Sequence, residues 1–366
     1  MVPTIPLYVD HLGGSAFIAG MALLAFSIPT LVVRPYLGRL ADRWSARWIL
    51  VGGLILSGVG SLLFLFPALI MVFVAGAVRG VGWGGVNTGG YTVLAVAAPP
   101  QRRAEAAAYY TSAIATASVF FPALALWLIG THGAFEWVFL LCAALSVIGL
   151  PVALKLPADN ASRADSAPPA TRRLLDRRVL VATYLNLAST LAMPSAMAFM
   201  PLYGRSLGIE SIGYFYVLAG VINIVIRPLL GQKADAIGRG PAIAVGLIAQ
   251  LAGFAVIAAA HTLGAILVGG ALIATGSSLI GSSSTALAMD LAHPQSRGQS
   301  MATYSLSYQL GVGIGAIIAG TLADAFGYSA MYVGAAVITA SGLLLLAACW
   351  RSLPKPSNAE SKLGPR

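Results

Sequence analysis

The sequence is poor in charged residues. Asp, Glu, Lys and Arg make up only 9% of its 366 residues, whereas about a quarter is typical of soluble domains. Hydrophobic residues account for 58%, and they recur in runs of about 20 residues, the length that an α-helix needs to cross a bilayer. The sustained alternation of a membrane β-barrel is missing. These features exclude an ordinary soluble domain and predict an all-α membrane protein with many spans.

Cysteine and histidine are also scarce. The chain has two cysteines, Cys142 and Cys349, and four histidines, and the cysteines lie far apart without CxxC spacing. The histidines fall at the edges of predicted spans, so the sequence indicates neither a cluster of metal ligands nor the serine and histidine at depth that an intramembrane protease needs. We therefore expect a protein that is not an enzyme and that uses no metal ion and no cofactor.

The formal net charge is +10, but the basic residues form clusters that alternate with links in which Arg205 is the one clear cation. This alternation follows the positive-inside rule. It predicts a multi-pass protein of the cell (inner) membrane with cytoplasmic basic clusters and a cytoplasmic C-terminus, and it disfavours a nucleic-acid partner. The clusters are Arg39, Arg43 and Arg47; Arg102 and Arg103; residues 155–178; Lys233 and Arg239; Arg297; and residues 351–366.

One stretch of the sequence occurs twice. Residues 34–42 read Arg-Pro-Tyr-Leu-Gly-Arg-Leu-Ala-Asp, and residues 227–235 read Arg-Pro-Leu-Leu-Gly-Gln-Lys-Ala-Asp. Each copy lies where an apolar run ends in a short link that we expect to form a turn. Pro-Leu-Tyr at 6–8 and again at 201–203 matches at nearly the same offset. A repeat that extends over most of the chain indicates two homologous halves.

We predict an N-terminal half at 1–154, a cytoplasmic linker at 155–178, a C-terminal half at 179–354 and a cytoplasmic tail at 355–366. The helix at 179–200 has no counterpart in the first half, because the offset of the repeat places that counterpart before residue 1. We therefore expect about 11 helices of a full set of 12, with the first one missing from this chain. The expected spans are 15–36, 48–67, 68–98, 104–129, 135–154, 179–201, 211–231, 241–260, 262–291, 300–326 and 328–350.

The repeated stretch continues into a motif that resembles a signature of the major facilitator superfamily of secondary transporters. In that superfamily the link after the second helix carries Gly, three residues, Asp, a basic residue, any residue, Gly and further basic residues. Here it begins at Gly38, with Asp42 and Arg43 in place and Ser45 where glycine is usual. The second copy keeps Gly231 and Asp235 but lacks the arginine after the aspartate. The resemblance implies two pseudo-symmetric helical halves.

The physical chemistry of this motif suggests a conformational role. Gly38 lets another helix approach closely, and Asp42, which we expect just beyond a helix end, can accept hydrogen bonds from a neighbouring helix N-terminus or pair with an arginine. Such contacts exist only when the cytoplasmic side is closed, so they would stabilise the outward-open state. Topogenic charge alone explains the arginines but not the glycines and aspartates. The gating residues that we predict are Gly38, Asp42, Arg43, Arg47, Gly231, Asp235 and Arg239.

Arg79 is the one charge that we expect deep inside a span. An arginine at that depth is costly unless it faces protein or water, so it marks a functional position by default. It resembles the arginine on the fourth helix of the superfamily that is linked to proton coupling. The alternative is a structural arginine that holds backbone carbonyls. The sequence places no Asp or Glu near the centre of a visible span, so a titratable partner would lie in the missing first helix, or the protein is a facilitator.

Several polar residues fall near mid-depth, where transporters of this class bind substrate between their halves, although each alone is more often an interhelical hydrogen bond. They are Asn87, Tyr91, Asn186, Thr190, Asn223, Ser277, Ser278, Tyr308 and Gln309. We expect a monomer in the lipid bilayer that exports a small organic solute by alternating access, with protons as the coupling ion. Uptake or facilitated diffusion of a metabolite such as a sugar or an organic acid is the first alternative. A non-transporting receptor on the same fold is the second.

Overall fold

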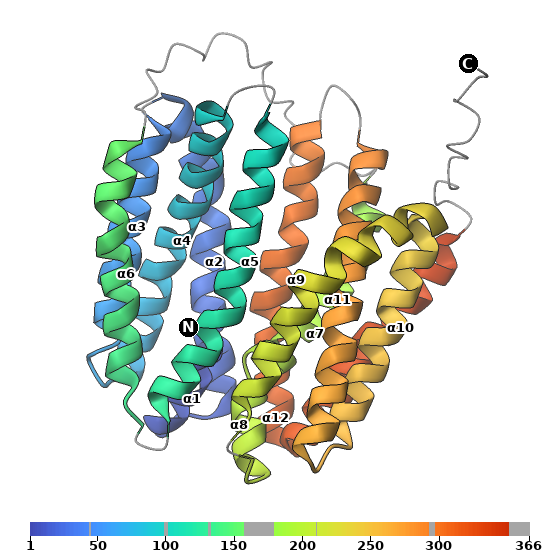
Figure 1. Cartoon of the computed structure of the whole chain (residues 1–366). Coiled ribbons are helices and arrows are strands. Elements are labelled where there is room, and N and C mark those ends of the chain that lie inside the picture. Colours follow the sequence, from blue (N-terminus) through green and yellow to red (C-terminus); the bar gives the residue numbers. More distant parts are fainter. Residues whose placement is uncertain are drawn as a thin grey trace, which may run out of the picture.

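The computed structural model describes residues 1–43, 45–98, 102–130, 133–156, 179–209, 211–292 and 297–350, and throughout this part of the chain the regular structure is helical. The helices form two groups that stand side by side (Figure 1). The first group is α1 (Thr4–His11), α2 (Ala16–Arg43), α3 (Ala46–Leu63), α4 (Leu69–Ala97), α5 (Arg103–Ile129) and α6 (Phe135–Lys155). The second is α7 (Leu180–Met197), α8 (Met200–Ser206), α9 (Gly213–Ile237), α10 (Arg239–Ala258), α11 (Leu263–Leu291) and α12 (Arg297–Cys349).

Most of the helices are long and apolar enough to cross a membrane. Within the described residues seven meet this condition alone, and the bent pair α7 and α8 makes an eighth. α5 and α9 contribute shorter apolar stretches, Thr116–Ile129 and Gly213–Ile224. α12 breaks at Gly327, where φ is 84°, so it contains two helices. Counted in this way, the described part of the chain holds the number of spans that the sequence predicts.

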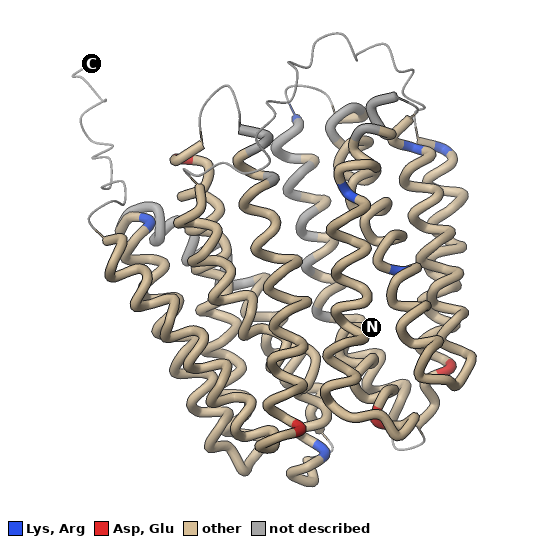
Figure 2. The backbone as a smooth tube through the Cα atoms, turned by 180° about the vertical axis from the view of Figure 1, so that it is seen from behind, with Lys and Arg blue, Asp and Glu red and all other residues tan. Residues whose placement is uncertain are grey.

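The two ends of the bundle differ in charge (Figure 2). Arg47 at the start of α3, Lys155 at the end of α6 and Arg239 at the start of α10 lie at one end, which we call the basic end. Asp10 at the end of α1 lies at the opposite end, which we call the acidic end, and so does Asp324, which contacts Ala16 at the start of α2.

The repeated stretch is helical, which corrects the expectation of a turn. α2 continues to Arg43 and α9 continues to Ile237, so Asp42 lies in the last turn of α2 and not beyond its end. The physical reason is local: leucine, arginine and alanine in this stretch are among the best helix formers. Pro35 does not end α2, and it lies inside the helix as Pro29 does.

The two halves repeat their local packing. A Cβ atom on Gly53 of α3 would lie 2.8 Å from the carbonyl oxygen of Gly82 in α4, and one on Gly253 of α10 would lie 2.6 Å from the carbonyl oxygen of Gly269 in α11. Each half thus brings one pair of helix backbones into direct contact, as glycine permits in membranes.

The tyrosine of the repeated Pro-Leu-Tyr donates a hydrogen bond to the C-terminal end of a helix in each half. Tyr8 Oη donates to the carbonyl oxygen of Phe64 at 2.8 Å, at the C-terminal end of α3. Tyr203 Oη lies 3.0 Å from the carbonyl oxygens of both Ile257 and Ala260, at the end of α10. The last carbonyls of a helix have no partner within it, so each tyrosine satisfies an otherwise orphaned acceptor.

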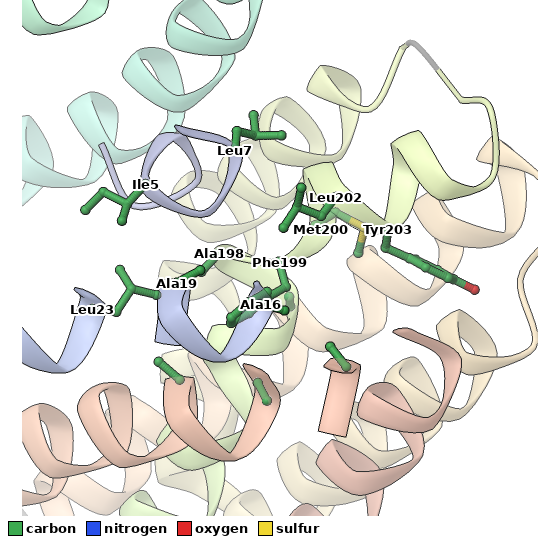
Figure 3. Close-up of a cluster of buried hydrophobic side chains, with 14 of the residues drawn as sticks. Ile5, Leu7, Ala16, Ala19, Leu23, Ala198, Phe199, Met200, Leu202 and Tyr203 are labelled. Carbon is green, nitrogen blue, oxygen red and sulfur yellow. The ribbon is translucent and has the colours of Figure 1, made fainter. Parts of the chain in front are cut away.

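Core packing joins the two halves at the acidic end. A single cluster of buried apolar side chains includes Ile5 and Leu7 from α1, Ala19 from α2 and, from the other half, Phe199 and Met200 (Figure 3). A second cluster contains residues of the C-terminal half alone, from the start of α7 to the last turns of α12, namely Val179, Ala182, Leu185, Ile243, Leu247, Ile280, Leu287, Ala288, Ala292, Tyr304 and Leu346.

We predict that Tyr203→Phe lowers the free energy of unfolding by about 1 kcal/mol, because the ring stays but a buried carbonyl loses its donor. Thermal unfolding of the purified protein in detergent would measure the change. The matched control is Tyr214→Phe, since Tyr214 is 63% exposed. Equal melting temperatures for Tyr203→Phe and the wild type would contradict the prediction.

Candidate functional site

The two halves meet along α2 and α12, whose backbones approach closely. A Cβ atom on Gly20 of α2 would collide with the carbonyl oxygen of Ala316 in α12. Further along the same contact, a Cβ atom on Gly313 would lie 2.9 Å from the Cβ of Ser27. This contact belongs to the same boundary between halves at which transporters with inverted or paired repeats bind their substrates.

Charged groups reinforce this boundary at the acidic end. The two carboxylate oxygens of Asp324 accept hydrogen bonds from the backbone N–H groups of Ala16 at 2.9 Å and Phe17 at 2.8 Å, at the N-terminus of α2. Arg205 of α8 lies 4.0 Å from Asp10 of α1, with both side chains about half exposed. An exposed pair at that distance contributes little, so Asp324 makes the stronger connection.

Asn186 and Thr190 are buried between α7 and α12. Asn186 Nδ2 donates to Ser307 Oγ at 2.8 Å. Thr190 Oγ1 lies 2.9 Å from the carbonyl oxygen of Asn186 and 3.0 Å from that of Ser307, and it contacts the site where Gly311 lacks a side chain. Both predicted cavity residues therefore join two helices of one half.

Asn223 of α9 and Ser278 of α11 form a second interhelical pair. Ser278 Oγ donates to Asn223 Oδ1 at 2.5 Å, while Asn223 Nδ2 donates to the carbonyl oxygen of Ala219 in its own helix. Ser277 donates within its own helix, to the carbonyl oxygen of Ala274. The structure thus brings Asn223 and Ser278 together and leaves Ser277 outside that pair.

The other predicted cavity residues do not form one polar cluster. Asn87 Nδ2 donates to the carbonyl oxygen of Trp83 one turn earlier in α4, and the exposed Tyr91 packs edge-on against Tyr110 of α5 with ring centroids 4.9 Å apart. On α12, Tyr308 is 60% exposed whereas its neighbour Gln309 is buried. Tyr91 and Tyr308 are thus the most exposed of the candidates.

A family model described as Major Facilitator Superfamily matches residues 1–264 and 227–366. The chain belongs to the major facilitator superfamily. Similar curated proteins include an uncharacterized MFS-type transporter of Methanocaldococcus jannaschii, which is 22% identical over 93% of this chain and 90% of its own length. One of Burkholderia pseudomallei is 27% identical over 92% of this chain and 84% of its own length.

Solved transporter structures share the fold. The nucleoside transporter NupG has a TM-score of 0.72 at 15% identity, with 96% of this chain and 94% of the other covered. A POT family transporter in complex with a thioalcohol-conjugated peptide has a TM-score of 0.79 at 12% identity, with 96% and 93% covered. The protein is therefore a multi-pass membrane transporter with the superfamily architecture that the sequence predicts.

The predicted gating motif is only partly within the described residues. The described residues do not include the side chains of Asp42, Arg43 and Asp235 or the surroundings of Gly231. No atom of the described residues lies within 4 Å of a Cβ built on Gly38. Arg47 Nη1 donates to the carbonyl oxygens of Leu154 at 3.4 Å and Leu156 at 3.3 Å, at the end of α6 in its own half. Arg239 forms an ion pair with Asp290 at 3.2 Å, which ties α10 to α11.

Arg79 lies well inside α4, at the contact with α3. Its Cγ occupies the space where a Cβ on Gly60 would be, and its buried Nε has no hydrogen-bond partner among the described residues. The glycine in α3 therefore makes room for the aliphatic part of the arginine. A buried guanidinium nitrogen without a partner is costly, which agrees with a position kept for function.

Sequence reasoning missed Asp324, although a signal was present. Gly-x-Leu-Ala-Asp occurs at 38–42, within the predicted gating motif, and again at 320–324. It also missed Ser307, the partner of Asn186, because a serine on an apolar helix carries no pattern that distinguishes it from others.

We predict that Asn186 and Ser307 are energetically coupled, since each is the other's partner in a buried hydrogen bond. In a double-mutant cycle of Asn186→Ala and Ser307→Ala the interaction energy should be about 0.6 kcal/mol and no more than about 1.7, the range found for such pairs in membranes. Chemical denaturation in detergent would measure it. Additive effects of the two substitutions would show that the pair does not hold α7 to α12.

Proposed function

We propose that this transporter exports a small organic solute by alternating access, with proton entry as the driving reaction. The observation that supports alternating access is the uneven contact between the halves. At the acidic end they share one apolar cluster and the α2–α12 contact, whereas a Cβ on Gly38, near the basic end of α2, meets no atom of the described residues within 4 Å. In alternating access the two halves are in contact at one end of the boundary between them and apart at the other. The contacts described here fit one of these two states.

The orientation follows from charge. Basic residues gather at the end where the two halves are linked, and the positive-inside rule assigns such an end to the cytoplasm. In this proposal the C-terminus is cytoplasmic, the protein lies in the cell (inner) membrane, and the conformation described above faces the cytoplasm.

Arg79 is the charge that we assign to coupling. The described carboxylates, Asp10, Glu136, Asp290 and Asp324, lie at or near helix ends or the break in α12, whereas Arg79 lies well inside the span Leu69–Leu94. Arg34 also lies within a span, but close to the basic end of Ala16–Gly38. The buried Nε of Arg79 has no hydrogen-bond partner among the described residues, which supports a guanidinium that responds to a change of charge nearby.

We predict that Arg79→Gln abolishes solute-dependent proton flux while the protein still inserts and folds. Proteoliposomes loaded with a pH-sensitive dye would be exposed to a panel of organic solutes, and the wild type should show proton movement with at least one of them. Solute flux without proton flux in the wild type would favour a facilitator. No flux of any solute would favour a receptor.

We predict that Asp42→Ala abolishes transport without loss of membrane insertion, because Asp42 stabilises the state that is closed on the cytoplasmic side. The control is Glu136→Ala, which removes an exposed carboxylate in the first turn of α6, away from the predicted gating residues. Transport rates and the amount of protein in the membrane would be measured together. A wild-type rate for Asp42→Ala would disprove the gating role.

A further inference from the structure

The Gly-x-Leu-Ala-Asp pattern occurs once in each of the two helices that join the halves, and the two copies lie at opposite ends of the bundle. Residues 38–42 form the last turns of α2, at the basic end. Residues 320–324 lie in α12 just before its break at Gly327, at the acidic end. In both copies the glycine and the aspartate are four residues apart, so they lie on one face of the helix.

The acidic-end copy shows how the pattern works. The carboxylate of Asp324 receives the first two backbone N–H groups of α2, one on each oxygen. The N–H of Ile18 instead donates to Ser15 Oγ, with the two heavy atoms 3.4 Å apart, and Ser15 is the residue just before α2. The first N–H groups of a helix have no partner inside it, and the positive end of the helix dipole attracts an anion. Asp324 therefore caps a helix that belongs to the other half.

Gly320 makes this cap possible. A Cβ atom on Gly320 would collide with the carbonyl oxygen of Ala16, and it would lie 3.0 Å from the Cα of Phe17. These are the two residues whose N–H groups Asp324 receives. The glycine therefore brings α12 against the first turn of α2, and the aspartate one turn later reaches the end of that helix.

The surroundings of the glycine in the basic-end copy differ from those of Gly320. Among the described residues, a Cβ atom on Gly38 would meet nothing within 4 Å, so none of their helices lies against that glycine. The glycine of the pattern is thus packed against the partner helix at the acidic end and without such a contact among the described residues at the basic end.

We propose that Gly320 and Asp324 form an acidic-end latch, the reciprocal of the Gly38–Asp42 motif. Asp324 on α12 caps α2 in the state closed at the acidic end, and Asp42 on α2 caps the start of α12 in the state closed at the basic end. Each latch forms only when the other is released, so the pair makes the transporter bistable. This inference rests on the alternating access proposed above.

The test measures distances across the halves at both ends, by double electron–electron resonance in lipid nanodiscs on the full chain without its two native cysteines. Each end receives one spin-label pair, placed at exposed positions outside both latches. The pairs are Glu136→Cys with His261→Cys at the acidic end, and Lys155→Cys with Met289→Cys at the basic end.

Asp324→Ala should lower the ratio of closed to open molecules at the acidic end by about tenfold, which corresponds to about 1.4 kcal/mol, and shorten the distances at the basic end. Gly320→Ala should act in the same direction, because it separates α12 from the first turn of α2. Asp42→Ala should shift both distributions the opposite way. The milder Asp324→Asn, which keeps one acceptor oxygen, replaces the alanine variant if that variant does not fold, and it should give a smaller shift of the same sign.

Two controls separate the latch from general damage. Thr321→Ala lies on the same turn of α12, and its hydroxyl donates only within the helix, to the carbonyl oxygen of Ile317. Gly281→Ala adds a methyl group where no atom lies within 4 Å. Both should leave the distances unchanged.

Unchanged distances in Asp324→Ala or Asp324→Asn, or a shift in the same direction as Asp42→Ala, would overturn the latch. The measurement needs no substrate, so it remains decisive if no transported solute is found. Conversely, if transport is demonstrated and Asp324 variants leave the distances unchanged, the latch fails while the proposed function stands.

Discussion

The contact between α2 and α12 is the constraint on which the rest of the structure depends. Inside a membrane no hydrophobic force draws two apolar helices together, so association relies on close packing and hydrogen bonds. Gly20 and Gly320 each bring one backbone against a carbonyl oxygen of the other helix, a distance that any side chain would prevent. Since this contact joins the two halves, its position along the helices determines which end of the boundary is closed.

Some of the polar residues connect helices within one half, and others connect the two halves. Asn186 with Ser307, and Asn223 with Ser278, connect helices of the C-terminal half, and Thr30 connects α2 to the carbonyl oxygen of Gly80 in the N-terminal half. The bonds from Asp324 to α2 instead cross between halves. Each half is thereby stiffened internally, which suits motion as a rigid body about their shared boundary.

Composition and repetition were enough to predict the fold, because bilayer thickness limits the length of a span and the repeat orders the helices. The sequence could not predict that α2 would continue through Asp42, since helix formers outside the membrane extend a helix without an apolar signal. The sequence also could not predict that Asn186 is buried and Tyr308 exposed. Both are expected at mid-depth, and only the packing of the helices determines which side chain is covered. The capping role of Asp324 depends on the N-terminus of α2 beside it, which the sequence does not reveal, although the spacing of Asp324 from Gly320 can be read from the sequence.

A helix cap suits a switch better than a strong ion pair would. Capping a helix N-terminus contributes about 0.5–2 kcal/mol, while moving an equilibrium from 1:99 to 99:1 takes about 5.5 kcal/mol. One cap therefore biases two conformations without locking either, and its partners are backbone N–H groups whose charge does not change with pH. The half-exposed pair of Asp10 and Arg205 contributes less than such a cap. A latch of this strength at each end lets a weakly bound solute or a proton decide the direction of the transition.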